Sequence, residues 1–288
     1  MTYSAEISTT HPALFGFLID QSGSMGHIMA GAGDMTKGQI CADYLNEFFN
    51  SLILRNIDGQ NIKNRFEIFA IGYGGINEMH SALPDVNIDD MPISLEKLQS
   101  IAQLKPKLKS IVKRIPDGAG GTIEEQSEVE IKKNEWIVPT YTGQTPMGRA
   151  FRDAYAITKN WVSSHSDSYP PIIINITDGG WTDENPEPIA ENLKLLKTDD
   201  GQVLVFNISI TKENKKPILF PDNTFLDKKH DDDSVLLFRM SSNLTDSMIN
   251  YARNMDIPIG LSAKGFVYNA NFENFINFLD IGTRPAMG

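Results

Sequence analysis

The sequence predicts an α/β fold with a doubly wound, mostly parallel central sheet flanked by helices. Residues 13–19 and 172–177 are apolar at nearly every position, as in strands buried on both faces of a parallel sheet. Strand-like and helix-like patterns alternate along the 288 residues, which is typical of crossover connections between parallel strands. We therefore expect one domain over 1–288, with an insertion at 76–140.

The N-terminal part is predicted to contain one long helix between two buried strands. Apolar residues recur at helical spacing between Asp34, the expected N-cap, and about Arg55. Residues 65–73 first alternate and then become continuously apolar, which indicates a second strand that ends at Gly74.

The stretch 76–140 interrupts this regular alternation, and for that reason it is expected to be an elaboration of the core. Residues 95–115 favour one or two helices that are broken near Pro106. Residues 117–121 are expected to form a flexible glycine-rich loop, and 128–138 a strand or half of a hairpin.

The C-terminal half returns to alternating strands and helices. Thr145 is expected to cap a helix that starts at Pro146 and runs to about Ser163. Further strands are expected at 172–177, 203–210, 218–220 and 265–268, and further helices at 186–196, 244–255 and 272–279. The acidic run 231–233 is expected to be a solvated loop or the start of a helix.

Composition narrows the class of protein. A net charge of -11 argues against a general nucleic-acid binder, which would present a basic face. The single cysteine, Cys41, excludes an internal disulfide and lies in an apolar helical pattern, where a small buried side chain is expected. The N-terminal residues lack a hydrophobic signal core, and no apolar run is long enough to span a bilayer. We therefore expect a cytoplasmic protein without a membrane partner.

Five oxygen-bearing residues are expected to converge on one metal ion. Asp20 and Asp178 each follow a predicted buried strand, and Ser22, Ser24 and Thr145 offer hydroxyls nearby. Loops at the carboxyl ends of parallel strands meet in one crevice of an open sheet. Two carboxylates and three hydroxyls suit a hard cation, and Mg²⁺ is expected, with Mn²⁺ or Ca²⁺ left open.

This ligand set favours binding over catalysis. Hydroxyl ligands add no negative charge, so a divalent ion with an open position attracts an acidic side chain of another protein. The pattern supplies no nucleophile or general base, and we expect no enzyme activity. Trp181, Arg149 and Arg152 are candidate partner contacts near the site. Trp181 is equally compatible with packing under its loop, and the arginines with a solvated helix face.

The same segments resemble a known family. Residues 20–25, 145–148 and 176–179 resemble the von Willebrand factor type A domain and its metal-ion-dependent adhesion site. The resemblance covers roughly 12–75 and 140–280, and it implies a central sheet flanked by helices. It also implies that Ser22, Ser24 and Thr145 contact the ion, while Asp20 and Asp178 bind directly or through water.

Two further segments resemble one branch of that family. Residues 265–269 and 278–285 resemble the tellurium-resistance-associated branch, whose members are intracellular and bacterial. This resemblance implies a scaffold or regulator with a kinase or phosphatase as partner. The stretch 76–140 exceeds what the family usually places there, which implies a specificity element or a lid.

Two alternatives remain open at this stage. A magnesium-dependent hydrolase of the haloacid dehalogenase type would need a second carboxylate where Ser22 stands. A structural domain with an idle metal site would contain the same residues without a partner. The five histidines (11, 27, 80, 165 and 230) are scattered, without the spacing of a histidine metal site.

Overall fold

The structure is a computed structural model that describes residues 3–29, 32–74, 79–116, 122–210, 216–270 and 278–279. Its main sheet has the strand order β11-β12-β10-β9-β1-β4-β5, with β6 beside β4. The parallel strands are β1 (Ala13–Asp20), β4 (Phe66–Tyr73), β9 (Ile172–Thr177), β10 (Leu204–Ser209) and β12 (Phe266–Tyr268). The antiparallel additions at the edges are β5 (Met79–Ser81), β6 (Ile93–Ser94) and β11 (Ile218–Leu219). The predicted fold class, a mostly parallel sheet in an α/β protein, is confirmed.

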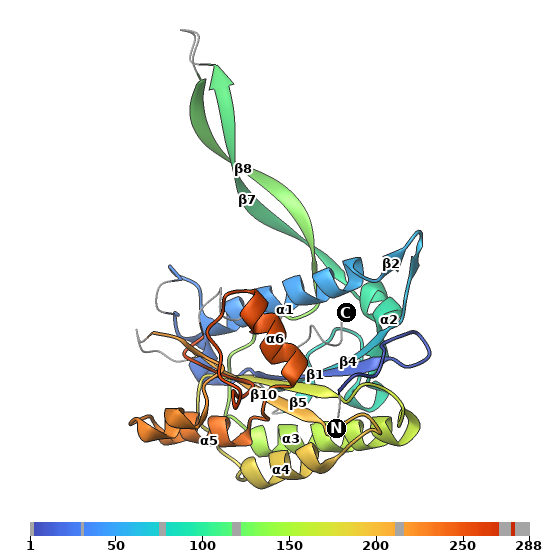
Figure 1. Ribbon diagram of the computed structural model, residues 1–288. Helices are drawn as coiled ribbons and strands as arrows, with labels where there is room; N and C mark the ends of the chain where they lie inside the picture. The colour runs from blue at the N-terminus through green and yellow to red at the C-terminus, as the bar shows by residue number, and fades with distance from the viewer. Residues whose placement is uncertain are drawn as a thin grey trace.

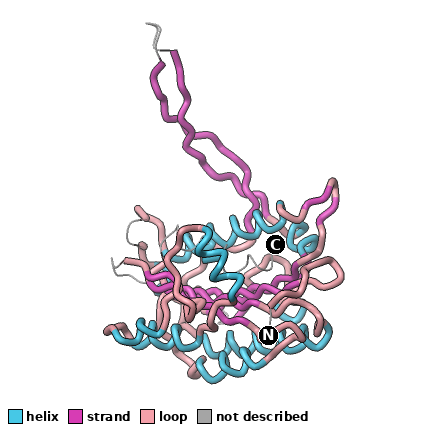
Figure 2. Tube along the Cα trace, viewed as in Figure 1, coloured by secondary structure: helices cyan, strands magenta, loops and turns pink. Residues whose placement is uncertain are grey.

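Helices form a layer on each face of this sheet (Figures 1 and 2). The face with α1 (Lys37–Leu54) also holds α2 (Leu95–Ser100), and Trp136 connects the two by packing against Phe49 and donating from Nε1 to the Leu98 carbonyl. The opposite layer consists of α3 (Met147–Ser164), α4 (Glu187–Leu195) and α5 (Asp232–Met240). A further helix, α6 (Asp246–Asn254), lies in the connection between α5 and β12.

The core lies between the sheet and these layers. Every residue of β1 is buried, and Phe15 and Phe17 pack edge-on against Phe48 of α1. Each such side chain contributes about 1.5–3 kcal/mol when it is removed from water. The helix α1 is capped by Thr36, which accepts from the Gln39 amide in a capping box, so the expected cap at Asp34 was wrong.

The order of the strands reverses at β1, and this reversal positions the candidate site. β1 pairs with β4 on one side and with β9 on the other, although the chain forms β4 and several later elements before it reaches β9. Crossover helices on opposite faces leave a crevice at the carboxyl ends of such neighbouring strands. Asp20 ends β1 and Asp178 directly follows β9, so both carboxylates lie at this crevice.

The helices predicted for 95–115 were wrong beyond Ser100. Residues Gln103–Pro116 form β7, which pairs antiparallel with β8, residues Thr122–Glu135, along its whole length. The resulting ribbon projects away from the body of the protein (Figures 1 and 2). The charged and apolar residues of this stretch are compatible with a helical or a strand period, and pairing with the next segment, residues 122–135, decides in favour of a strand. The hairpin expected at 128–138 is confirmed, and the loop expected at 117–121 lies outside the described residues.

The stretch 76–140 therefore has two parts. Its first part adds β5 and β6 to the edge of the main sheet beside β4. Its second part is the ribbon, whose base is fastened to α1. The contacts are Lys107 with Asp43, Lys133 with Glu47 (2.7 Å), Asn134 with Asn50 (3.1 Å), and Asn46 Oδ1 with the amides of Trp136 and Ile137.

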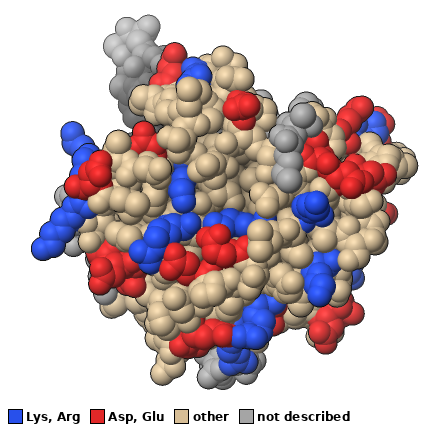
Figure 3. All heavy atoms as spheres, turned by 60° about the horizontal axis from the view of Figure 1, so that its bottom comes forward, with Lys and Arg blue, Asp and Glu red and all other residues tan. Residues whose placement is uncertain are grey.

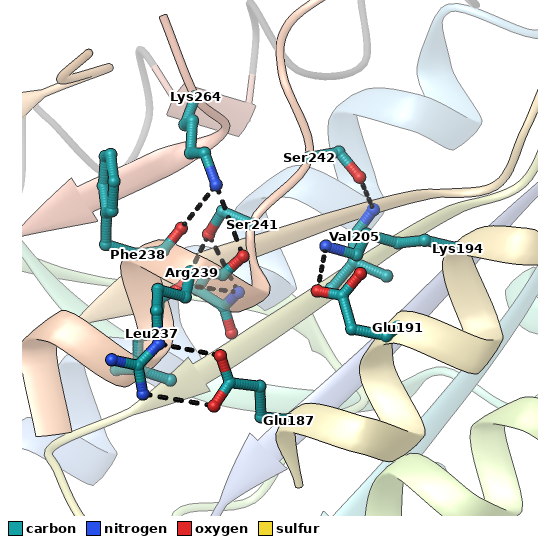
Figure 4. A network of polar contacts seen from close by, with 11 residues as sticks. Glu187, Glu191, Lys194, Val205, Leu237, Phe238, Arg239, Ser241, Ser242 and Lys264 are labelled. Carbon is teal, nitrogen blue, oxygen red and sulfur yellow. Dashed lines mark hydrogen bonds and ion pairs between the residues drawn. The ribbon is translucent and has the colours of Figure 1, made fainter. Parts of the chain in front are cut away.

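The helix α5 is held by a polar network that joins it to α4 and to the segment before β12 (Figure 4). Arg239 donates from Nε to Glu187 Oε1 at 2.7 Å, and Lys264 Nζ donates to the Phe238 carbonyl at 3.2 Å. Within α4, Lys194 pairs with Glu191. These contacts fasten the C-terminal end of α5, and its first turn faces the crevice.

The remaining predicted elements agree with the structure to within a few residues. The helix at 147–164, the helix at 187–195, the helix at 246–254 and the later strands are present, and the acidic run starts α5. Cys41 is buried, as expected. The helix expected at 272–279 lies outside the described residues except for 278–279.

The surface over α3, α4 and α5 carries acidic and basic side chains close to one another (Figure 3). None of the helices in the described part of the chain is long and apolar enough to cross a membrane.

Candidate metal centre

A crevice of about 380 Å³ opens at the carboxyl ends of β1 and β9. Its lining includes three of the predicted ligands, Ser24, Thr145 and Asp178. The other lining residues are Lys37, Gly179, Gly180, Ser209, Asp231, Asp233 and Ser234. Asp20 and Ser22, the two remaining predicted ligands, are buried beside it at 1% and 2% exposure. The sheet thus brings residues from three distant segments to one place.

Asp20 is held from two sides within the protein. Its Oδ1 accepts from the Ser22 amide at 2.9 Å, and its Oδ2 accepts from the Thr177 hydroxyl at 2.7 Å. Burial raises the pKa of this carboxyl to about 6, because the charged form loses hydration. A cation nearby would favour the ionised form, so the position suits a carboxylate that faces a metal ion.

The serine hydroxyls and Asp178 form a chain of closely spaced oxygens. Ser22 Oγ and Ser24 Oγ share a hydrogen bond of 3.1 Å, and Ser24 Oγ donates to Asp178 Oδ1 at 2.7 Å. Adjacent ligands of an octahedral Mg²⁺ with metal–oxygen distances of about 2.0–2.1 Å lie about 2.9 Å apart. The spacing of these oxygens therefore fits such an ion.

Thr145 does not cap α3, which corrects the expectation that it would. The N-cap position is Pro146, and Asp183 accepts hydrogen bonds from the first free amides, those of Gly148 (3.1 Å) and Arg149 (2.9 Å). Thr182 also accepts from the Thr145 amide at 2.9 Å. Within the described part of the chain, the Thr145 hydroxyl makes no hydrogen bond to protein, which leaves it available to an ion in the crevice.

Two glycines allow the site loops to approach this closely. Gly74 has φ +103°, and a Cβ there would lie 2.6 Å from the Ser22 amide nitrogen. A Cβ on Gly148 would collide with the backbone and side chain of Glu184. The close approach at Gly74 sets the position of the loop that carries Ser22 and Ser24, which is called the serine loop below. The close approach at Gly148 sets the start of α3.

Lys37 is a component of the site that the sequence patterns did not predict. Its Nζ donates to Asp178 Oδ2 at 2.6 Å, with side-chain exposures of 1% for Lys37 and 7% for Asp178. The overlooked signal is its spacing, because Lys37 precedes Cys41, Tyr44 and Phe48 on the buried stripe of α1. A lysine on an otherwise apolar stripe indicates a buried charged partner.

The first turn of α5 supplies the rim of the crevice. Asp231 caps the helix by accepting from the Ser234 amide at 2.8 Å. Asp233 lies against Gly180, whose Cβ would be 3.1 Å from its carboxylate. Burial raises the pKa of Asp233, and the negative charges of Asp231, Asp232 and Asp178 raise it further. The rim is therefore acidic.

The predicted partner contacts lie outside the lining of the crevice. Trp181 follows Gly180 and is 38% exposed. Arg152 forms an exposed ion pair with Glu184. The side chain of Arg149 is exposed at the start of α3. Their role in binding a partner stays a prediction.

Comparison with known proteins finds similar solved structures, of which two are described below. Neither a protein-family model nor a curated protein sequence matches the chain. The first structure is the vWF domain of the type V pili tip protein Mfa5 from Porphyromonas gingivalis, with a TM-score of 0.31, 12% identity, 85% of this chain and 51% of that chain covered. The second is the pilus adhesin RrgA from Streptococcus pneumoniae, with a TM-score of 0.30, 13% identity, 62% of this chain and 22% of that chain covered. This chain thus spans about half of the first protein and under a quarter of the second.

The donor set decides which ion the site could hold. Among the described residues, no group of three or more histidine, cysteine, aspartate or glutamate side chains is arranged to hold a metal. A site here must therefore use hydroxyl oxygens together with Asp20 and Asp178. Such an oxygen-only set fits Mg²⁺, and its few carboxylates fit Ca²⁺ less well.

Proposed function

We propose that this protein is a non-catalytic, metal-dependent binding module that captures an acidic side chain of a partner protein. The observation that supports this proposal best is the chain of closely spaced oxygens from Ser22 through Ser24 to Asp178, beside a crevice whose lining also includes Thr145. In this proposal Ser22, Ser24 and Thr145 bind Mg²⁺, and Asp20 and Asp178 bind it directly or through water. The ion would supply the positive charge that attracts the partner's carboxylate.

The acidic lining supports dependence on the ion. Asp178 is already paired with Lys37, and Asp231 and Asp233 face the same crevice, so without a bound divalent ion the acidic rim repels an approaching carboxylate. A bound divalent ion would attract the incoming carboxylate at close range, whereas Asp231 and Asp233 lie at the more exposed rim, where solvent screens their charges. Capture should therefore require the ion.

The setting that we propose rests on the sequence resemblance. In this proposed setting, the protein is a scaffold or regulator of a stress or signalling system in the bacterial cytoplasm. A kinase or phosphatase that presents Asp or Glu would then be the partner. Trp181 would add an exposed aromatic contact beside the crevice, with Arg149 and Arg152 at its edge.

The decisive experiment compares wild type with Thr145→Ala, and uses Thr142→Ala, an exposed threonine outside the crevice, as the matched control. Calorimetric titration should show Mg²⁺ binding to wild type and Thr142→Ala, and binding at least tenfold weaker to Thr145→Ala. Capture of partners from lysate should be lost with EDTA and in Thr145→Ala. If EDTA leaves the captured proteins unchanged, metal-dependent capture is wrong.

Thr145→Ala and a further variant, Asp20→Asn, test the two alternative functions, an idle structural site and a hydrolase. An idle structural site predicts that Thr145→Ala lowers stability without changing what is captured. A hydrolase predicts steady Mg²⁺-dependent turnover of a generic phosphate ester that Asp20→Asn abolishes. We expect no turnover, because Ser22 stands where that mechanism needs its second carboxylate.

A further inference from the structure

Lys37 is paired with one carboxylate of the proposed metal site. Its Nζ lies 2.6 Å from Asp178 Oδ2, and Asp178 Oδ1 accepts from Ser24 Oγ. The lysine comes from α1 and the aspartate from the end of β9, so the pair spans two elements that the fold brings together. The side chain of Lys37 is 1% exposed.

The position of Lys37 is unfavourable for the fold alone. It is the first residue of α1, where the partial positive charge of the helix N-terminus disfavours a cation. Its ammonium is also buried, which costs free energy unless an anion compensates it. A neutral side chain would fill this end of the buried stripe without either cost. The ion pair with Asp178 is the interaction that compensates these two costs.

The charge of Lys37 makes the electrostatic potential at the proposed ion position more positive. Asp20 and Asp178 together balance a divalent cation. Lys37 leaves one positive charge in excess, which weakens the hold on the ion and strengthens attraction for an anion from outside. Asp231 and Asp233 lie at the more exposed rim, where solvent screens their charges more strongly.

We propose that Lys37 is an internal cation that sets the affinity of the metal site. It holds Asp178 in place when no ion is bound, and it keeps the loaded site positive so that a partner's carboxylate completes it. This inference rests on the proposed metal-dependent function and deepens it. Lys37 acts through Asp178 and is a positioning residue.

The test measures Mg²⁺ affinity by calorimetry in wild type, Lys37→Met, Lys37→Gln and Lys37→Arg. Lys63→Met is the matched control, because Lys63 forms an exposed ion pair with Asp58 away from the site. Loss of the charge in Lys37→Met or Lys37→Gln should tighten Mg²⁺ binding at least about 10- to 100-fold, which is the effect of one charge a few ångströms from a divalent ion at the dielectric constant of water, about 80; a lower effective dielectric constant enlarges it. Lys37→Arg and Lys63→Met should stay within threefold of wild type.

Thermal unfolding with and without Mg²⁺ provides a second readout. Without Lys37, Asp178 is a buried, uncompensated charge, so the neutral variants should melt lower and gain more from Mg²⁺ than wild type. Gln can still donate to Asp178, which makes Lys37→Gln the variant better able to fold. If both neutral variants fold only with Mg²⁺ present, the ion replaces the lysine charge, and the proposal is supported.

The outcomes distinguish this inference from the proposed function. If wild type binds Mg²⁺ and the neutral variants bind it equally or more weakly, the role of Lys37 is overturned and the metal site stands. If only the neutral variants bind Mg²⁺, Lys37 controls the site, but metal-dependent capture by wild type is wrong. If no variant binds Mg²⁺, or the neutral variants fold under neither condition, the inference is overturned.

Discussion

Single residues decide whether the Thr145 hydroxyl is available to an ion. A threonine before Pro146 is a common cap, yet here Asp183 accepts the free amides of α3 and Thr182 holds the Thr145 backbone. Because a residue from another loop does the capping, the threonine side chain can face the crevice. The proposed metal site therefore depends on residues outside its proposed ligand set.

Asp183→Ala tests this dependence. Loss of the cap should lower the free energy of unfolding by about 1 kcal/mol, in the range of N-cap substitutions, and should weaken Mg²⁺ binding because Thr145 loses its fixed position. Urea unfolding and calorimetry measure the two effects. Asp34→Ala is the control, because Thr36 and not Asp34 caps α1. Equal Mg²⁺ affinity in Asp183→Ala and wild type would contradict the argument.

Gly74→Ala tests the close approach of the serine loop. Positive φ and the missing space beside the Ser22 amide should together cost about 3 kcal/mol, and Mg²⁺ binding should weaken. Gly59 also has positive φ (+65°) but has nothing within 4 Å of a Cβ, so Gly59→Ala should cost only about 1–2 kcal/mol and leave binding intact. Similar losses in both variants would show that backbone strain alone matters.

At the scale of elements, a buried chain of polar side chains links the sheet to α5. Tyr73 donates to Asn175 Oδ1 (2.8 Å), Asn175 donates to Asn207 Oδ1 (3.0 Å), and Asn207 donates to Ser241 Oγ (3.0 Å). These groups are buried in a low-dielectric core, where each bond is strong and each missing partner is costly. The chain fixes α5, and with it the acidic rim of the crevice.

Asn207→Leu should break this chain in its middle. The amide of Asn175 and the hydroxyl of Ser241 would each lose a partner, so we expect a loss of about 2–4 kcal/mol in the free energy of unfolding. Urea unfolding measures it. Asn254→Leu, at an exposed position at the end of α6, should change stability by less than about 0.5 kcal/mol. A tolerated Asn207→Leu would mean that the chain does not hold α5.

For the whole molecule, the β7–β8 ribbon is the most distinct departure from a simple α/β domain. It projects from the body, and the described residues that line the crevice include none from the ribbon. A two-stranded ribbon without a second layer is marginally stable on its own in water, so the ribbon depends on its contacts with α1 and contributes little to the core. The resemblance implied either a specificity element or a lid for this stretch. The position of the ribbon does not support a lid over the crevice.

Replacing residues 108–130 with a short glycine-containing turn should therefore leave the protein folded. The base contacts of Lys107, Lys133 and Asn134 with α1 are retained. We expect the free energy of unfolding to change by less than about 1 kcal/mol, because this part of the ribbon projects from the body and the base contacts are retained. Mg²⁺ affinity should stay unchanged. Loss of cooperative urea unfolding in the shortened protein would refute this view of the ribbon.

Much of the fold and of the candidate site followed from local patterns. Continuous apolar runs predicted β1 and β9, and helical spacing predicted α1, α3, α4 and α6, because burial of a face leaves its period in the sequence. Asp20 and Asp178 could be placed together because parallel strands end at the same edge. Asp183, Lys37 and Asp233 could not be placed in this way, since each acts on a segment far along the chain.

By itself, the sequence determined the class of the sheet and the residues able to supply oxygen ligands, since both depend on residue type and short-range period. The tertiary structure alone decided that 103–116 is a strand, that Thr145 is free of capping, and that Lys37 neutralises Asp178. Strand pairing, caps from other loops and buried charge pairs are contacts between residues that do not lie in one short window of the sequence. Local patterns do not encode such contacts, and the packed fold does.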